Sequence, residues 1–594
     1  MKKFLALLLL PALLGISLVP ALAAPVSQLN DLARYFPADT AVFVATRIDD
    51  DFFGELDSII ARIASVLPPG TIPPLTIEEA LDMALAEADP PLRFQADIRT
   101  WLGDTAAVGV LEFPLEADEM SSDAPLRPRS MDNDVPILLA IAITSRDAAV
   151  TFLTNTLTAS DTEFTRTDEP DFTLIENPDN PDSAVVIRDD VMLIGNRFAS
   201  ITALPETSLS ADADFVSTFD LLPETDYNAT VYLNLSDILR QVMESDSEAA
   251  AAATGMFGSM FSAIGPQAWG ATILEGVSLT IDAVQRFDGL SLLEEMGIPV
   301  TLTPINPAFA AHVPAGAPLV IHSTGLGTSI EALFITLDRQ MQGLIESGLA
   351  DDDELEAMQK GLADFEAAFT TFTGLDLRED VASWMTGDYA MFLMLNPELN
   401  LNSQFGIFVT FPLDFGLAIQ ATDPDAAAAT VTGLTQALER LAALAANQED
   451  AEAKVTISAD TIGSNAVTVV TITSNEMPWP VELLLGSNNE VFALGTRNAV
   501  TAIFSRDGGL PANPAFARAQ NFLLPDPISV GYLGTGGLLP LADLIVTFAE
   551  DDAEAEQQAQ AVRDLLNLFP SATVSQSMDA DGNSFSRLVL TLAE

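Results

Sequence analysis

The chain of 594 residues has two histidines, His312 and His322, four lysines and no cysteine, so apart from its carboxylates few side chains could act as a catalytic base. The histidines flank a predicted strand and lack the His-Glu-Xaa-Xaa-His spacing of a zinc site. Lys360 and Lys454 have no Ser-Xaa-Xaa-Lys partner. We therefore expect His322 to be a core or edge histidine, and we expect a non-enzymatic chain with no catalytic residue, metal site or cofactor.

Paired carboxylates are the remaining route to hydrolysis, because two acids about 5–10 Å apart can cleave a glycosidic bond. With 85 Asp and Glu residues, some pair will satisfy that distance by chance. A carboxylate-based hydrolase therefore stays only as an alternative. The segment "DADGN", Asp579–Asn583, resembles part of a calcium loop, but its glycine comes too early for one. This position favours a hairpin turn.

A tryptophan motif recurs: Trp101 is followed by Gly103, and Trp384 is followed by Gly387. A tryptophan could stack on a ligand. A helix that ends at the tryptophan, with glycine as its left-handed cap, explains the pattern better. We therefore expect a structural role for both tryptophans.

The stretch "AAAAATGMFGSMFSAIG" contains four adaptable apolar residues, Met256, Phe257, Met260 and Phe261. A core helix would explain them. A groove for a lipid or for an apolar partner is the functional alternative. These four are the candidate ligand-binding residues of the sequence.

The charge is strongly one-sided, with 85 acidic residues against 25 basic ones and a net charge of −60. Such a field repels phosphate backbones and anionic headgroups, so we expect no nucleic acid and no anionic membrane surface as partner. Salt adaptation is one explanation of the acidity. An ordinary solvated acidic surface is the other, and the composition does not separate the two.

The N-terminus has the pattern of a secretory signal peptide. Lys2 and Lys3 precede the apolar run "FLALLLLPALLGISLV", and "ALA" at 21–23 supplies small residues for cleavage. We expect residues 1–23 to be removed and the mature chain to be extracellular or periplasmic, with an uncleaved anchor as the alternative. Loss of the two lysines would change the net charge from −60 to −62.

Several blocks of sequence occur twice in the same order. "FPADTAVFVAT" from Phe36 returns as "VPAGAPLVIHS" from Val313, and "DIRTWLGDTAAVGVL" from Asp97 returns as "DVASWMTGDYAMFLML" from Asp380. Matched blocks in a fixed order are hard to produce by chance, so they predict a duplicated module rather than a solenoid of short repeats.

The predicted duplication divides the chain into a first half, 27–304, and a second half, 305–594. Within each half, apolar strands alternate with amphipathic helices without a strict βαβ rhythm. One helix is predicted to begin at a Ser145 cap, and its counterpart at Thr422 or Asp423. We therefore expect an α+β fold of two tandem homologous halves, each a largely antiparallel sheet flanked by helices.

Four repeated features together resemble a known family. These are the leading "PADTAVFV" strand, the Trp-Gly-Asp turn, the helix opened by "DPDA" from Asp423, and a Val-Xaa-Leu-Gly strand before another helix. They resemble the domain-of-unknown-function family 3352, whose members are mostly exported bacterial proteins without assigned activity. The resemblance implies an exported protein and offers no catalytic residue to carry over. The extreme acidity departs from lysine-rich members.

Together these patterns predict an exported, soluble, non-enzymatic protein of the cell envelope or exterior with a structural or binding role. Two alternatives stay open: a carrier of an apolar ligand or lipid, and the carboxylate-based hydrolase. The partner is expected to be a protein or an apolar ligand.

Overall fold

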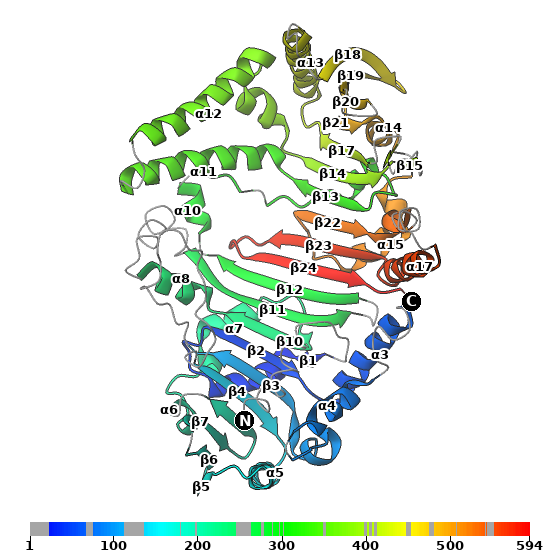
Figure 1. Ribbon diagram of the computed structural model, residues 1–594. Coiled ribbons are helices and arrows are strands. Elements are labelled where there is room, and N and C mark those ends of the chain that lie inside the picture. Colours follow the sequence, from blue (N-terminus) through cyan, green and yellow to red (C-terminus); the bar gives the residue numbers. More distant parts are fainter. Residues whose placement is uncertain are drawn as a thin grey trace. The chain divides into compact units, whose positions relative to one another are not determined.

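The computed structural model describes residues 23–66, 75–88, 90–111, 136–178, 180–195, 199–244, 263–274, 278–287, 289–295, 297–300, 302–347, 352–396, 401–402, 407–408, 413–446, 453–474, 480–506, 508–540, 542 and 552–593. The chain divides into two compact units (Figure 1). The first comprises Met1–Gly289 with Asp581–Phe585, and the second comprises Leu290–Ala580 with Ser586–Glu594. The boundary predicted from the repeats, 304/305, differs from this division, which assigns 290–304 to the second unit.

The first unit contains an antiparallel sheet. Its strands pair in the order β12 (Ser278–Phe287), β11 (Ile264–Leu274), β10 (Ala229–Leu233), β2 (Val42–Arg47), β3 (Leu102–Val110), β4 (Ile137–Ile143), β8 (Val191–Gly195), β7 (Asn180–Ile187), β6 (Thr173–Asn177) and β5 (Thr165–Asp168). The short strands β1 (Ala24–Pro25) and β9 (Asp226–Tyr227) form a separate antiparallel pair.

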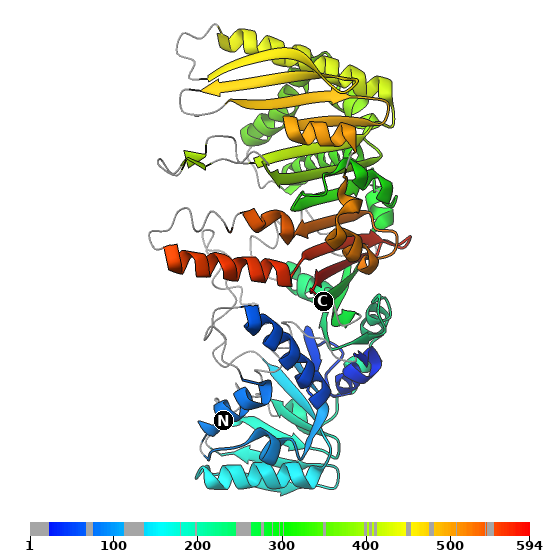
Figure 2. The same cartoon turned by 90° about the vertical axis from the view of Figure 1, so that its right-hand side faces the viewer.

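Helices of the first unit connect these strands. They are α2 (Val26–Leu29), η1 (Asn30–Tyr35), α3 (Asp50–Val66), α4 (Ile77–Ala86), the π-helix η2 (Phe94–Ile98), α5 (Arg146–Ala159), α6 (Ala199–Thr202), η4 (Leu209–Ala211), α7 (Ala213–Phe219) and α8 (Leu235–Glu244). Helix α5 lies beside β7, at the end of the sheet (Figure 2).

The second unit contains an antiparallel sheet of its own. Its strands pair in the order β23 (Ser571–Met578), β22 (Ser529–Gly534), β13 (Leu319–Thr324), β14 (Asp388–Leu395), β17 (Leu413–Gln420), β21 (Val491–Thr496), β20 (Val481–Ser487), β19 (Asn465–Ser474) and β18 (Ala453–Ile462). Strand β24 (Ser584–Thr591) follows β23 in the chain, and β15 (Leu401–Asn402) pairs with β16 (Ile407–Phe408).

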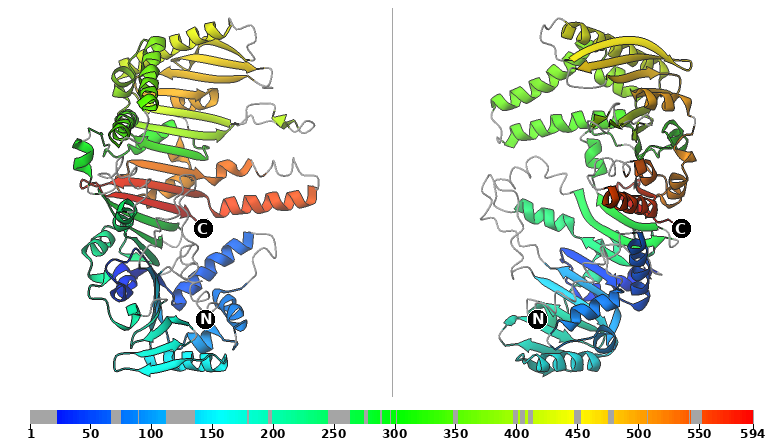
Figure 3. Two further views of the ribbon diagram at one scale, coloured as in Figure 1. Left: turned by 60° about the vertical axis from the view of Figure 1, so that its left-hand side comes forward. Right: turned by 45° about the vertical axis from the view of Figure 1, so that its right-hand side comes forward.

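The helices of the second unit include two long neighbours, α11 (Leu326–Ser347) and α12 (Asp352–Thr373), which lie beside each other (Figure 3). The others are α10 (Leu290–Glu295), η5 (Pro307–His312), the π-helix η6 (Leu377–Val381), η7 (Ala382–Trp384), α13 (Pro424–Ala446), α14 (Arg497–Ser505), η8 (Leu510–Ala512), α15 (Pro514–Ala519), η9 (Gln520–Phe522), η10 (Thr535–Leu538) and α17 (Asp552–Leu568). Within the described residues, no helix has both the length and the apolar character that a membrane span needs.

The α+β class with antiparallel sheets, predicted from the sequence, is confirmed. The strand orders of the two units also correspond position by position, from β11 and β23 at one side to β5 and β18 at the other. The repeated proline occupies the same place in each unit, since Pro37 bridges Ser208 and Pro314 bridges Gly509. The duplication of 27–304 and 305–594 stays a prediction, which residue-by-residue superposition tests.

Each sheet has buried clusters against both faces. In the first unit, Phe36, Phe43 and Phe215 belong to one cluster and Trp101 belongs to the other. In the second unit, one cluster includes Phe516 with Tyr532, and the other includes Trp384 with Phe492. Burial of large aromatic side chains contributes most to such cores, which matters in a chain without disulfides.

The predicted helix caps are confirmed by their hydrogen bonds. Ser145 Oγ accepts from the Ala148 N–H at 3.3 Å, which fixes the start of α5. At the start of α13, the cap is Asp423, whose Oδ1 accepts from the Ala426 N–H at 3.0 Å. Each cap satisfies a backbone N–H that the helix itself leaves without a partner.

Candidate functional site

The four candidate ligand-binding residues of the sequence, Met256, Phe257, Met260 and Phe261, lie outside the residues that the structure describes. Their role stays a prediction. The candidate site of the structure therefore rests on other elements.

Both histidines are buried, and each is 4% exposed. His312 Nδ1 lies 2.9 Å from the Ile503 carbonyl oxygen, and burial lowers the pKa of His312 below its usual value. His322 Nε2 lies 3.5 Å from Asp388 Oδ2 and has no hydrogen-bond partner among the described residues. In the described part of the chain, no three His, Asp or Glu side chains are placed to hold a metal ion. Both histidines thus belong to the core of the second unit.

The two tryptophans of the repeated motif are buried, at 1% exposed for Trp101 and 2% for Trp384. Trp101 Nε1 donates to the Asp97 carbonyl at 2.9 Å, and Trp384 Nε1 donates to Thr430 Oγ1 at 3.1 Å. Each indole is thereby held by its own unit, which supports the structural role.

The predicted left-handed glycine caps after these tryptophans are wrong. Neither Gly103 nor Gly387 has a positive φ. The glycines are needed for close approach instead, because a Cβ on Gly103 would lie 2.8 Å from the Ala142 carbonyl carbon. A Cβ on Gly387 would lie 2.4 Å from Gln420 Oε1. Real Cβ atoms essentially never come so close to a neighbour. A larger residue at Gly103 would displace the strand that carries Ala142, whereas at Gly387 it would displace the Gln420 side chain.

The segment Asp579–Asn583 connects β23 to β24 and is a turn. Gly582 has a φ of +93°, a conformation that favours glycine. This agrees with the hairpin turn that the sequence favours.

An exposed patch of apolar side chains lies on one face of the second sheet. Seven large apolar residues make it up, each between 37% and 42% exposed: Leu319, Ile321, Met391, Leu393, Leu413, Leu533 and Val574. We refer to this set as the apolar face. It spans β23, β22, β13, β14 and β17, which are neighbours in the sheet.

Strand register places these side chains next to each other. Ile321 is paired with Met391, and Leu319 is paired with both Leu393 and Leu533. Directly paired residues of neighbouring strands point to the same side of a sheet, with Cβ atoms about 4.5–5.5 Å apart. The alternate residues point the other way, and Val320 is buried in the opposite cluster. The apolar face is therefore continuous across neighbouring strands.

The positions of this face carry no charge in the described strands β13, β14, β17, β22 and β23. Its polar members are Ser323, Tyr389, Ser529 and Gln576. This is unexpected in a chain in which 85 of 594 residues are Asp or Glu, because a solvated sheet face would carry its share of acids. Contiguous exposed apolar surface of this kind marks binding sites more often than a scatter of single exposed leucines.

The first unit has a corresponding surface. Trp269 on β11 is 39% exposed and Ile281 on β12 is 37% exposed. Trp269 is paired with Val231 on β10 and with Ala283 on β12, so these side chains share one face. Across the described residues of β10, β11 and β12, this face carries no charged side chain.

A polar pocket of about 440 Å³ in the first unit is a weaker candidate. Each of its two arginines bonds to a neighbouring aspartate: Arg47 Nε lies 2.6 Å from Asp49 Oδ2, and Arg99 Nε lies 2.7 Å from Asp50 Oδ1. These contacts hold the start of α3 against the sheet, which is a structural role.

No curated protein and no solved structure matches this chain. A family model does match, over a region that includes most of the apolar face and both repeats of the tryptophan motif. The resemblance predicted from the repeated motifs is thereby confirmed. The chain belongs to the family described as Protein of unknown function (DUF3352), whose model matches residues 76–493, more than half of its length.

Proposed function

We propose that this chain is an exported, non-enzymatic binding protein of the cell envelope or exterior, and that the apolar face of its second unit binds the acyl chain of an uncharged lipid. The observation that carries the proposal is the absence of charge across that exposed face in so acidic a chain. Binding without catalysis is supported by the histidines, which are both buried in the core.

The chemistry of the face favours an acyl chain over other occupants. Side chains of Leu, Ile, Val and Met offer no strong hydrogen bond, so a polar ligand would lose its bonds to water without replacement. A second copy of the chain would bring another charge of −60 close to the first, which disfavours self-association. An uncharged lipid tail meets neither obstacle, and each buried CH₂ contributes about 0.8 kcal/mol.

Binding is expected to be visible with N-phenyl-1-naphthylamine, an uncharged fluorophore that brightens in apolar surroundings. The full chain should bind it saturably, and 1-monooleoylglycerol should displace it. A double variant, Ile321→Thr with Met391→Thr, should lose at least tenfold in affinity, which equals about 1.4 kcal/mol. Threonine keeps the strand, because its branched side chain suits a sheet.

A matched control uses exposed apolar residues elsewhere in the same unit. Leu441 and Leu444 on α13 are 47% and 58% exposed, and their double replacement by glutamine should leave affinity within twofold of the wild type. Equal losses in both double variants, or full affinity in the Ile321/Met391 variant, would show that the apolar face is not the site.

Export is tested separately at the N-terminus. The protein recovered from outside the cytoplasm is expected to begin at Ala24, because "ALA" at 21–23 supplies the small residues that a signal peptidase requires. Intact mass measurement checks this. A mature protein that keeps Met1 or Lys2 would contradict cleavage.

A further inference from the structure

A second surface, independent of the apolar face, lies in the first unit. It is a groove of about 670 Å³ between α5 and the chain segment that carries η2 and Trp101. The side chains on α5 include Asp147, Phe152 and Asn155, and the opposite wall includes Leu92. The rings of Trp101 and Phe152 pack against each other with centroids 5.2 Å apart.

Two of the four hydroxyl groups that line the groove in the described residues are already used within α5. Thr151 donates to the Asp147 carbonyl at 2.7 Å, and Thr156 donates to the Phe152 carbonyl at 2.9 Å. Hydroxyls that bond back to their own helix have no proton left to donate to a ligand. The groove is therefore less suited to a sugar than its composition implies, and better suited to apolar side chains.

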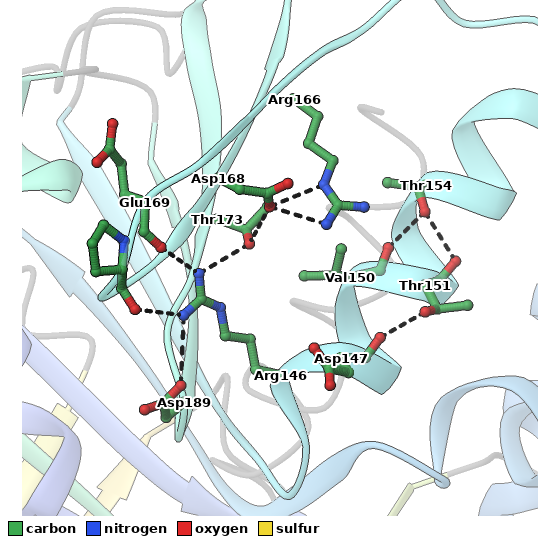
Figure 4. Close-up of polar contacts among 11 residues, drawn as sticks. Arg146, Asp147, Val150, Thr151, Thr154, Arg166, Asp168, Glu169, Thr173 and Asp189 are labelled. Carbon is green, nitrogen blue, oxygen red and sulfur yellow. Dashed lines mark hydrogen bonds and ion pairs between the residues drawn. The ribbon is translucent and has the colours of Figure 1, made fainter.

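Helix α5 is fixed at its N-terminal end, as Figure 4 shows. The Arg146 guanidinium donates to the carbonyls of Glu169 and Pro170 at 3.0 and 3.2 Å and to Thr173 Oγ1 at 3.2 Å. It also lies 3.7 Å from Asp189 Oδ1. These contacts tie the helix to the strands beside it, so the wall of the groove is held in place.

The corresponding surface of the second unit is covered by a helix. There α13 takes the place of α5, and α12 packs along it. Leu375, just after α12, sits against α13 so closely that a Cβ on Gly433 would lie 2.6 Å from its Cδ1. Arg440 of α13 donates to the carbonyls of Thr371 and Phe372, at the end of α12.

In the described part of the first unit, no helix makes the contact with α5 that α12 makes with α13. Leu92 and Leu375 each precede the tryptophan of their unit by nine residues, and Asn155 and Gly433 each follow the helix cap by ten. Gly433 lets the two segments touch, whereas Asn155 is exposed and the groove lies between it and Leu92. Helix α4 is the helix before Leu92, as α12 is the helix before Leu375. It has 10 residues, whereas α12 has 22.

The negative charge of the groove favours partners with positive charge. Among the described residues, its lining includes Asp97 and Asp147 and no basic side chain, within a chain of net charge −60. Complementary potential speeds encounter and rejects partners of like charge. We infer that the groove binds one amphipathic helix of a partner protein, with an apolar face and basic flanks, in the place where α12 covers α13.

The test uses a labelled synthetic peptide with the sequence of residues 360–373, in which Asp364 and Glu366 are replaced by lysine. Fluorescence anisotropy with the full chain should show saturable binding. Asn155→Arg should weaken it at least tenfold, because the new side chain fills the groove and offsets one of its two negative charges. The matched control is Thr158→Arg, which adds the same charge at an exposed position of α5 outside the groove and should bind within twofold of the wild type.

Three outcomes would overturn the inference. The first is no saturable binding of the peptide. The second is an equal loss of affinity in Asn155→Arg and Thr158→Arg. The third is equally tight binding of a scrambled peptide of the same composition, which would mean that binding depends on charge alone. Sedimentation of the free chain provides a further check. A dimer that Asn155→Arg dissolves would identify a second copy as the occupant instead. Circular dichroism of both variants confirms that α5 is still folded.

Discussion

Replacing Trp384 with alanine is expected to destabilise the second unit by about 3–5 kcal/mol, the range for large-to-small changes of buried aromatic residues. Trp384 is 2% exposed and packs on Phe492 with ring centroids 5.6 Å apart. Its Nε1–H also donates to the buried Thr430 hydroxyl, and that bond would be lost. Denaturant unfolding followed by circular dichroism measures the loss. Hydrogen exchange of β14 and β17 peptides assigns it to this unit.

Trp269 provides a control with the same residue type. It lies on β11 of the first unit and is 39% exposed, so its replacement by alanine removes less contact and leaves no closed cavity. We expect Trp269→Ala to lower the free energy of unfolding by less than half as much as Trp384→Ala does. Similar losses for the two substitutions would mean that Trp384 is not a core residue of its unit.

Much of the fold could be predicted because it depends on local chemistry. The proline turns at Pro37 and Pro314, the Ser145 cap and the Asp423 cap each act over a few residues, and each lies where the sequence places it. Their recurrence in the same order also predicted two similar sheets. The α+β class followed from these elements, since helices and strands mix without a βαβ rhythm.

The glycines after the tryptophans show where local reasoning fails. A left-handed cap depends only on the chain itself, but the constraint on Gly103 comes from Ala142, which is far away in the sequence. Close approach between strands leaves no pattern in one segment alone. The sequence pattern correctly indicated that position 103 requires glycine, but the interpretation as a left-handed helix cap was wrong.

The apolar face was missed for a related reason. Strand β13, "LVIHST", has apolar residues on both of its sides, and such a run is typical of a strand buried on both faces. The structure buries Val320 and exposes Leu319 and Ile321. Which side is covered depends on helices far along the chain. The useful signal was the absence of acids from one face of five neighbouring described strands, and it appears only once their register is known.

The groove required the same long-range knowledge. Trp101 and Asn155 are separated in the chain by β3 and β4, and neither lies in a recognisable binding motif. The comparison of Asn155 with Gly433 becomes meaningful only when α5 and α13 occupy equivalent places beside their sheets. Sequence alone suggested a binding surface from composition, at Met256–Phe261. The structure adds two surfaces defined by geometry.

The acidity of the chain predicts how its stability depends on salt. With a net charge of −60, repulsion between exposed carboxylates opposes the folded state, which brings them closer than the unfolded chain does. The screening length falls from about 30 Å at 0.01 M salt to about 10 Å at 0.1 M. The melting temperature, followed by circular dichroism, should therefore rise between these concentrations. A melting temperature that does not change with salt would mean that the acids are held in specific native contacts.

Acid should act in two opposing ways between pH 7 and 5. Protonation of exposed carboxylates relieves repulsion and should raise the melting temperature modestly. A carboxylate that bonds to arginine takes up its proton only at lower pH. The hydrogen bond from Arg497, for example, lowers the pKa of Asp460 below its usual 3.8. Stability from that pair is present above pH 3.8 and is lost only below it. The rise should therefore not be offset by broken ion pairs of this type.

His312 works against that rise, and a variant can isolate its contribution. Burial lowers the pKa of His312 below 6.5, so below pH 6.5 the unfolded chain binds a proton that the folded chain does not. Its contribution to stability is complete above pH 6.5 and declines as pH falls towards the folded pKa. His312→Asn keeps an N–H donor for the Ile503 carbonyl but does not titrate. Denaturant unfolding at pH 7, 6 and 5 should show wild type losing stability relative to the variant as pH falls. A constant difference between the two proteins would mean that His312 takes up its proton equally well when folded, and would exclude it as the group that opposes the acid effect.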